Sequence, residues 1–377
     1  MNPSGSLNPS PRTLEVESLS GFDRLVGAGA KSMHGWHAQS LDLRGRAPAL
    51  AAMDAEGAVF LGCTFDPGVE DALRRRGALI FPKLAGVPFD AYRAELYTPQ
   101  ELYAGIRDTP YEETPDALVY QWSIRSGQRH RLDATLAAAL HDHAIGDALD
   151  ELSRSARDGG RTIVGVMGGH AAQRGSKGFA DAAVLGRLLA RSGRMVATGG
   201  GPGAMEAANL GAYLSEAPED EFRAVLLELA AVPGFRPSVS AWARAAAAVV
   251  ERYPGGTASV GIPTWFYGHE PPNYFATRIA KYFANAVREA ILLALCNGGI
   301  VFLPGAAGTV QEIFQDACEN YYGAPETLTP MVLVGRDHWE RRYPTWPMLQ
   351  SLAAGRAMEE RIFLVDSVDE ALAVLDS

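Results

Sequence analysis

The sequence predicts an α/β fold, in which a doubly wound parallel sheet follows a smaller N-terminal α/β domain. One observation is the alternation of apolar runs with segments of helical spacing: strand 162–167, helix 179–191 and strand 194–198 follow one another. Another is that glycine-rich turns follow two predicted strands and begin helices, at 199–203 and 304–308. Strands alternating with helices form a Rossmann-like parallel sheet, whose ligands bind beyond the carboxyl ends of the strands.

Length, composition and charge narrow the class of protein. The chain has 377 residues, of which 47% are hydrophobic and 21% charged, so it can form two domains with sizeable cores. The net charge of −10 argues against a general role in nucleic-acid binding, so we expect no nucleic-acid partner.

Cysteine usage and hydropathy indicate the compartment. Cys63, Cys296 and Cys318 are scattered and show no CxxC spacing, which favours a reducing compartment and argues against disulfides and a zinc site. The N-terminus lacks an apolar signal core, and no apolar run reaches membrane-spanning length. We therefore expect a cytoplasmic protein with no membrane partner.

The N-terminal part is predicted to hold a disordered tail, 1–11, and an α/β domain of unknown role, 12–157. Its clearest piece is strand 58–63, helix 69–76 and strand 78–81. This unit is either a degenerate relative of the C-terminal fold or an unrelated small α/β domain.

No catalytic or metal-binding set stands out in that domain. His130, His141 and His143 lack metal-ligand spacing, so surface or capping roles are expected for them. No GxSxG elbow, Walker A loop or HExxH zinc motif occurs in the chain, and we predict no metal site.

The predicted C-terminal domain, 158–377, begins at a Gly-Gly junction. A helical insertion, 215–256, follows the second strand, and further elements complete the alternation: strand 258–262, helix 275–296, strand 300–303, strand 331–334, helices near 348 and 368, and a strand near 363. Within helix 275–296 the spacing places Ile279, Phe283, Val287, Ile291 and Leu295 on a buried face. Arg278, Lys281, Asn285 and Arg288 form a polar stripe, which is a solvated face or, near its end, part of a ligand pocket.

The stretch 298–312 organises the domain. Its strand, glycine turn and helix make an anion site, because small residues let backbone N–H groups approach a phosphate at the helix start. Glu312, one turn into the helix, would be repelled by a phosphate and therefore belongs beside a neutral part of a ligand, such as a ribose. In the alternative interpretation Thr309 and Glu312 form a capping box and serve the helix alone.

The turn at 199–206, Gly-Gly-Gly-Pro-Gly-Ala-Met-Glu, also fits the dinucleotide fingerprint. A true NAD site needs an acidic residue after the next strand, whereas Glu219, Asp220 and Glu221 lie in a polar linker. A dehydrogenase is therefore weakly supported.

Together, 199–206 and 304–312 resemble the LOG ("Lonely guy") family, whose signatures are GGGxxGxM and PGGxGTxxE and many of whose members are mislabelled as lysine decarboxylases. The resemblance covers about 161–365. The segment Glu270-Pro-Pro-Asn273 also looks like the larger pyrimidine/purine nucleoside 5′-monophosphate nucleosidases, which carry an extra N-terminal domain.

The resemblance implies a phosphoribohydrolase that cleaves a nucleoside 5′-monophosphate to free base and ribose 5-phosphate without a cofactor. It implies catalytic roles for Glu312, which contacts ribose and water, and for Arg288. It also implies a homodimer or a larger even-numbered homo-oligomer. The implied substrate- and phosphate-binding residues are Gly199, Gly200, Gly201, Gly203, Met205, Glu206, Pro304, Gly305, Ala306, Gly308 and Thr309, with Gly169, Ser176 and Asn273 as further candidates.

Two residues differ from the family's motifs at positions that bear on which substrate is bound and whether it is cleaved. Ala306 replaces the second glycine of PGG, which restricts the backbone, and Glu289 replaces the second residue of the family's Arg-Lys pair. A nucleotide-binding sensor or carrier without hydrolysis is therefore the alternative function.

Overall fold

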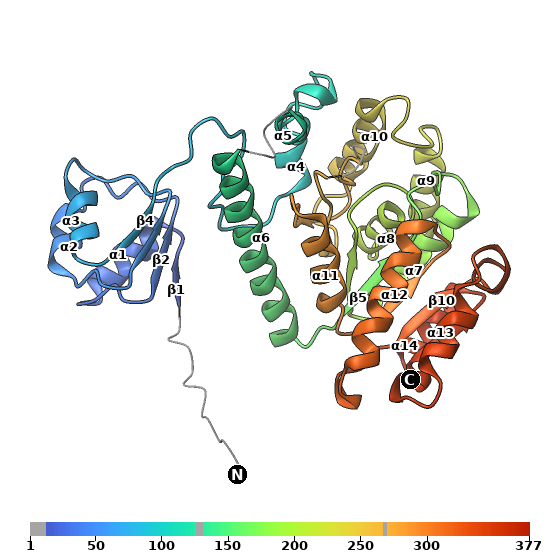
Figure 1. Cartoon of the computed structure of the whole chain (residues 1–377). Helices are drawn as coiled ribbons and strands as arrows, with labels where there is room; N and C mark the ends of the chain where they lie inside the picture. Colours follow the sequence, from blue (N-terminus) through green and yellow to red (C-terminus); the bar gives the residue numbers. More distant parts are fainter. Residues whose placement is uncertain (1–12, 126–130, 267–269) are drawn as a thin grey trace, which may run out of the picture. The chain divides into compact units, whose positions relative to one another are not determined.

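The computed structural model describes residues 13–125, 131–266 and 270–377 (Figure 1). The predicted tail 1–11 and His130 lie outside the described residues. The chain divides into two compact units. The N-terminal unit runs to Glu95 and includes Leu136–Ala144, and the C-terminal unit comprises Leu96–Thr135 and Ile145–Ser377.

The N-terminal unit is built on a parallel sheet with strands in sequential order. Its strands are β1 (Leu14–Val16), β2 (Trp36–Gln39), β3 (Val59–Leu61) and β4 (Leu79–Phe81). They are connected by α1 (Leu19–Gly27), α2 (Ala47–Ala52) and α3 (Val69–Arg75). The predicted strand–helix–strand piece is present as β3, α3 and β4.

The period of two along these strands determines which side chains form the core. Ala38, Phe60 and Ile80 are buried at equivalent positions of three neighbouring strands. On β4, the two residues flanking Ile80, Leu79 and Phe81, are exposed instead. His141, expected in a surface or capping role, is fully buried in this unit, and its ring lies edge-on to Phe89.

The C-terminal unit contains a larger sheet in the order β11-β10-β9-β5-β6-β7-β8, with every pairing parallel. The strands are β5 (Ile163–Met167), β6 (Met195–Thr198), β7 (Ser259–Gly261), β8 (Arg278–Ile279), β9 (Ile300–Phe302), β10 (Met331–Val334) and β11 (Ile362–Val365). The predicted doubly wound parallel sheet is therefore confirmed. The strand order changes direction between β5 and β9, and such switch points are where ligands bind.

The helices of this unit include predicted ones that begin close to their expected positions, with one exception described below, and others that were not predicted. They include α4 (Pro99–Leu102), α5 (Pro115–Ile124), most of α6 (Leu132–Asp158), α7 (Lys177–Arg191), α8 (Ala204–Tyr213), α9 (Glu219–Leu229), α10 (Val239–Arg252), α11 (Asn285–Leu295), α12 (Ala307–Tyr322), α13 (Thr345–Ala353) and α14 (Val368–Leu375). Helix α7 contacts α8 and α14, whereas α12 contacts α11 and α13. Two helical groups therefore accompany the sheet.

Contacts assign Leu96–Thr135 to the C-terminal unit, although the sequence suggested a boundary at 157/158. The carboxylate of Asp116 on α5 is fully buried, and its Oδ1 accepts hydrogen bonds from Lys281 Nζ at 2.5 Å and Trp265 Nε1 at 2.9 Å. Tyr97 also exchanges backbone hydrogen bonds with Ile279. Burial lowers the pKa of Lys281, and the charge of Asp116 opposes that shift.

The helix predicted over 275–296 is wrong in its first half. Strand β8 occupies Arg278–Ile279, and α11 begins only at Asn285. The backbone N–H of Ala280 donates to Gly261 and that of Tyr282 donates to Pro263, so hydrogen bonds to distant segments replace the helical ones. Consequently Lys281 is buried and not part of a polar stripe, and Val287 is 46% exposed.

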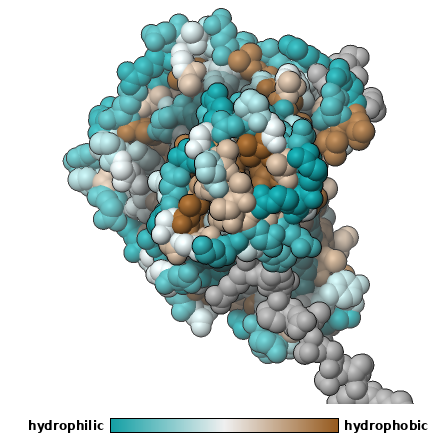
Figure 2. Space-filling view, turned by 90° about the vertical axis from the view of Figure 1, so that its left-hand side faces the viewer, coloured by the Kyte–Doolittle hydropathy of each residue, from teal (hydrophilic) through white to brown (hydrophobic). Residues whose placement is uncertain are grey.

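The molecular surface is largely hydrophilic on the face drawn in Figure 2, where apolar residues form separated patches. In the described part of the chain, no helix combines the length and apolar character needed to cross a bilayer.

Candidate functional site

Three loops meet beyond the carboxyl ends of β9, β5 and β6, which are neighbours at the centre of the larger sheet. The backbone N–H of Gly169, after β5, donates to the carbonyl of Pro304, after β9, at 3.3 Å. The N–H of Ala204, after β6, donates to the Gly169 carbonyl at 3.2 Å. The candidate residues 169, 199–206 and 304–309 are therefore brought together at the switch point.

The loop after β6 needs glycine for a steric reason. Gly203 has a φ of 76°, and a Cβ there would lie 2.6 Å from the carbonyl oxygens of Gly169 and His170. The fully buried Asn273 is hydrogen-bonded to the same loop. Its backbone N–H donates to the Gly200 carbonyl at 2.8 Å, and its Nδ2 donates to the Gly201 carbonyl at 3.2 Å. Asn273 therefore holds the loop in place.

Glu206 lies in a closed environment. It is 1% exposed, and its Oε1 accepts from Arg174 Nε at 2.9 Å while its Oε2 accepts from Trp242 Nε1 at 3.1 Å. Because the first N–H of α8 is also bonded to Gly169, this helix start offers little to a ligand. Ser176 is likewise occupied, since its hydroxyl caps α7 by accepting from the N–H of Phe179 at 3.2 Å.

The start of α12 is open by contrast. Its N-cap is Ala306, with no capping side chain, and Pro304, Ala306 and Gly308 are exposed. The unpaired N–H groups and the positive end of the helix dipole are therefore available to an anion. The Nε2–H of His338 donates to the Gly305 carbonyl at 2.8 Å and fixes the loop from the side of β10.

The capping-box interpretation is wrong, because Thr309 stands inside α12 and the N-cap is Ala306. Thr309 is 4% exposed and packs on Gly305, where a Cβ would lie 2.1 Å from its Oγ1. The φ of Ala306 is −120°, so this position does not need the positive φ that favours glycine.

Arg288 and Glu312, distant in sequence, form an ion pair at this opening. Their Nη1 and Oε1 atoms are 3.7 Å apart, and the two side chains are 14% and 16% exposed. Nε and Nη1 of Arg288 are buried, and neither has a hydrogen-bond partner among the described residues. Nη1 also lies 3.6 Å from the Cβ position of Gly199, so the guanidinium extends from α11 to the loop after β6. Because buried donors usually have hydrogen-bond partners, these two donors of the partly buried Arg288 are available to a ligand.

Burial raises the pKa of Glu312 to about 7; the charge of Arg288 opposes that rise, and Glu289 and Glu270 add to it. Glu289, in place of the family's second cation, is itself held by amides: Asn285 Nδ2 donates at 2.7 Å and Gln311 Nε2 at 2.5 Å. At neutral pH the Glu312 carboxyl can therefore gain or lose a proton readily.

Sequence reasoning missed a second charged pair at the site. Nδ1 of His170, after β5, lies 3.0 Å from Oε1 of Glu270, and this interaction raises the pKa of the histidine. Oε2 of Glu270 is 3.2 Å from the Cβ position of Gly201. The available signals were the position of His170 directly after the Gly168–Gly169 turn and the presence of Glu270 in a segment that resembles the nucleosidases. Met205 packs against the loop after β6: its Sδ lies 2.8 Å from the position that a Cβ at Gly199 would occupy.

The fold and the site define an α/β protein in which three loops meet at the switch point of a parallel sheet. The profile of the SLOG cluster4 family matches residues 161–217, which supports the resemblance seen in the sequence. Similar solved structures include the molybdenum cofactor binding protein from the phototrophic bacterium Rippkaea orientalis (17% identity, TM-score 0.37) and the Moco Carrier Protein from Chlamydomonas reinhardtii (19% identity, TM-score 0.35). Each likeness covers 57% of this chain and 96% of the other. No curated protein sequence matches the chain.

Proposed function

We propose that the chain hydrolyses the N-glycosidic bond of a nucleoside 5′-monophosphate, giving the free base and ribose 5-phosphate. The observation that best supports this function is the pair formed by Arg288, with unused buried donors, and Glu312, one turn into a helix whose start is open. Buried donors usually have hydrogen-bond partners, so the two buried donors of Arg288 that lack one can bind the substrate.

The 5′-phosphate would lie at the loop that begins α12, where Pro304, Ala306 and Gly308 are exposed and where backbone N–H groups and the α12 dipole favour negative charge. This anchoring would place the neutral ribose beside the Glu312 carboxylate. The phosphate would stay further away, because two negative charges repel each other. Arg288, between Glu312 and Gly199, would donate to the phosphate or to a ribose hydroxyl.

In the reaction, the bond between C1′ and the base nitrogen breaks, and its electron pair leaves with the base. The sugar becomes oxocarbenium-like, and the Glu312 carboxylate stabilises that charge. Water then bonds to C1′ while Glu312 accepts its proton, and the departing base takes a proton from solvent. A pKa of about 7 suits this proton-accepting role at neutral pH.

A binding protein without hydrolysis is the second candidate, and Glu289 favours it. Its charge adds to the rise in the pKa of Glu312, so less of that carboxyl is ionised. Nucleotide binding needs the open loop of α12 and does not need an ionised Glu312.

Base release from a panel of nucleoside 5′-monophosphates, followed by chromatography, separates the two functions. We expect release from at least one nucleotide and none from the matching nucleoside, since the nucleoside lacks the anchoring phosphate. Equal cleavage of both would contradict phosphate anchoring. Binding measured by calorimetry without any base release would establish the second function instead.

A further inference from the structure

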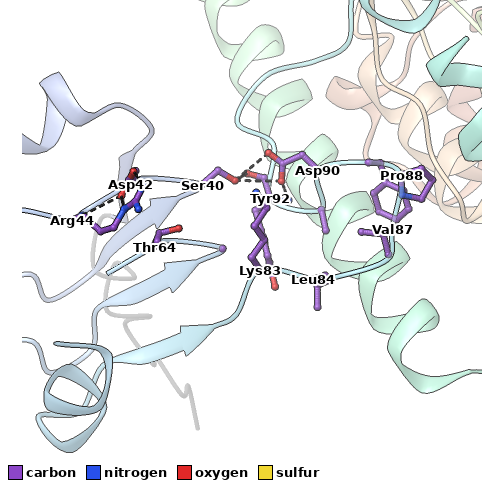
Figure 3. A pocket seen from close by; sticks show the side chains of 13 residues that line it. Ser40, Asp42, Arg44, Thr64, Lys83, Leu84, Val87, Pro88, Asp90 and Tyr92 are labelled. Atoms are coloured by element: carbon purple, nitrogen blue, oxygen red, sulfur yellow. Dashed lines mark hydrogen bonds and ion pairs between the residues drawn. The ribbon is translucent and has the colours of Figure 1, made fainter. Parts of the chain in front are cut away.

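The N-terminal unit contains a pocket of about 670 Å³ that shares no residue with the Arg288–Glu312 site (Figure 3). Its lining includes Ser40 directly after β2, Gly62 directly after β3 and Lys83 shortly after β4. Because these strands are parallel, the pocket lies at the carboxyl edge of the sheet, where open parallel α/β sheets bind their ligands. Its volume is within the range of roughly 300–1,000 Å³ that is typical of small-molecule sites.

One wall of the pocket is segment 82–92, which is fastened to the strand ends. The Ser40 hydroxyl donates to Asp90 Oδ2 at 3.1 Å, and the Tyr92 hydroxyl donates to the Pro82 carbonyl at 3.0 Å. The Tyr92 ring covers Gly62, where a Cβ would lie 2.5 Å from it. These contacts within the unit hold segment 82–92 against the strand ends.

Ser40 also has an unusual backbone. Its φ of 52° makes it the one non-glycine residue with a positive φ in the described ranges 13–125, 131–266 and 270–377. That conformation costs energy for serine, and such residues cluster at binding sites.

The charged groups of the pocket differ in whether they have hydrogen-bond partners within the protein. Asp42 accepts from Arg44 Nε at 2.7 Å and from Nη2 at 2.5 Å, and Asp90 accepts from the Tyr92 N–H at 2.9 Å as well as from Ser40. Both carboxylates thus have donors within the protein. Lys83 is exposed at the pocket and makes no hydrogen bond or ion pair with any described residue, so its ammonium group can bind a ligand of opposite charge.

Most of the polar side chains lie opposite the apolar ones, and Asp90 is the polar residue that shares segment 82–92 with the apolar ones. Figure 3 shows Asp42, Arg44 and Thr64 on one side, Leu84, Val87 and Pro88 on the other, and Lys83 between them. We propose that this pocket binds a small organic anion, with its carboxylate or phosphate at Lys83 and its apolar part against Leu84, Val87 and Pro88.

Calorimetry on the full chain with phenyl phosphate and benzoate tests the proposal, since each probe joins one kind of anion to an apolar ring. The measurements use an Arg288→Ala background, which weakens the C-terminal anion site. We expect Lys83→Met to weaken binding by about tenfold or more, because a charge-assisted hydrogen bond is lost. Lys31→Met, at an exposed lysine of the same unit outside the pocket, should leave binding unchanged.

Hydrogen exchange with each probe bound gives the location, and protection is expected in segment 82–92. Binding of phenyl phosphate alone, of benzoate alone or of both supports the site and identifies the anion it accepts. The proposal is overturned if neither probe binds at millimolar concentration, if Lys83→Met binds as its parent does, or if protection is confined to 199–206 and 304–312. None of these outcomes depends on hydrolysis at the C-terminal site.

Discussion

Replacement of Glu312 by glutamine removes a charge from the proposed site while keeping the size of the side chain. If the carboxylate stabilises the cationic sugar, turnover should fall by about 10²–10³, corresponding to roughly 3–4 kcal/mol of lost transition-state stabilisation. Nucleotide binding should be unchanged or slightly tighter, because a negative charge near the phosphate is removed.

The same substitution should change stability in a pH-dependent way. The pKa of Glu312 rises from 4.5 to about 7 on folding. Below pH 4.5 the carboxyl is protonated in both states and does not reduce the free energy of unfolding; as the pH rises through 7, that stability is lost. Glutamine does not ionise. We therefore expect little difference from wild type near pH 4.5 and a variant that is more stable by up to about 3 kcal/mol near pH 8.

Three measurements on one preparation check this reasoning: base release by chromatography, nucleotide affinity by calorimetry, and thermal unfolding at several pH values. Asp316→Asn is the matched control, because Asp316 is a buried acid one turn further along α12. The wild-type rate should rise as Glu312 ionises around pH 7. Wild-type turnover in Glu312→Gln would refute the catalytic role and transfer it to another group.

Two further outcomes are expected from the structure, and a third from the family resemblance. Asp316→Asn should keep its turnover and gain stability, on the order of 2–4 kcal/mol near pH 7. The reason is that burial raises the pKa of Asp316 from 3.8 to about 8. A thermal unfolding series that shows no gain would contradict this. Arg288→Met should weaken nucleotide binding by about tenfold or more and move the midpoint of the pH–rate profile above that of wild type, since Arg288 lowers the pKa of Glu312; an unmoved midpoint would place Arg288 outside the site. Light scattering should report a homodimer or a larger even-numbered assembly, and a monomer at micromolar concentration would disprove it.

The sequence alone determined the central parts of the fold. Strands β5, β6 and β9 and helices α7, α8 and α12 occur where apolar periodicity and glycine turns predicted them. This is possible because a buried strand and a turn at positive φ, such as Gly203, depend on the residues of that segment itself. The phosphate-type loop at the start of α12 was found for the same reason.

Only the tertiary structure decided which candidate residues are free to act. Glu206 and Glu312 both lie near the start of a helix that follows a glycine turn, yet Arg174 and Trp242 saturate the first, whereas the second meets the under-bonded Arg288. Their partners come from distant segments that no local pattern relates.

The segment before α11 shows the same limit of sequence reasoning. Its helical spacing was regular, but hydrogen bonds to Gly261 and Pro263 and the buried contact of Lys281 with Asp116 hold it extended. Propensity contributes only tenths of a kcal/mol per residue, so several hydrogen bonds to other segments, together with burial, outweigh it. For this protein, local sequence determined the central strands, glycine turns and helices, whereas long-range contacts determined the extended segment before α11 and which charged side chains face the opening.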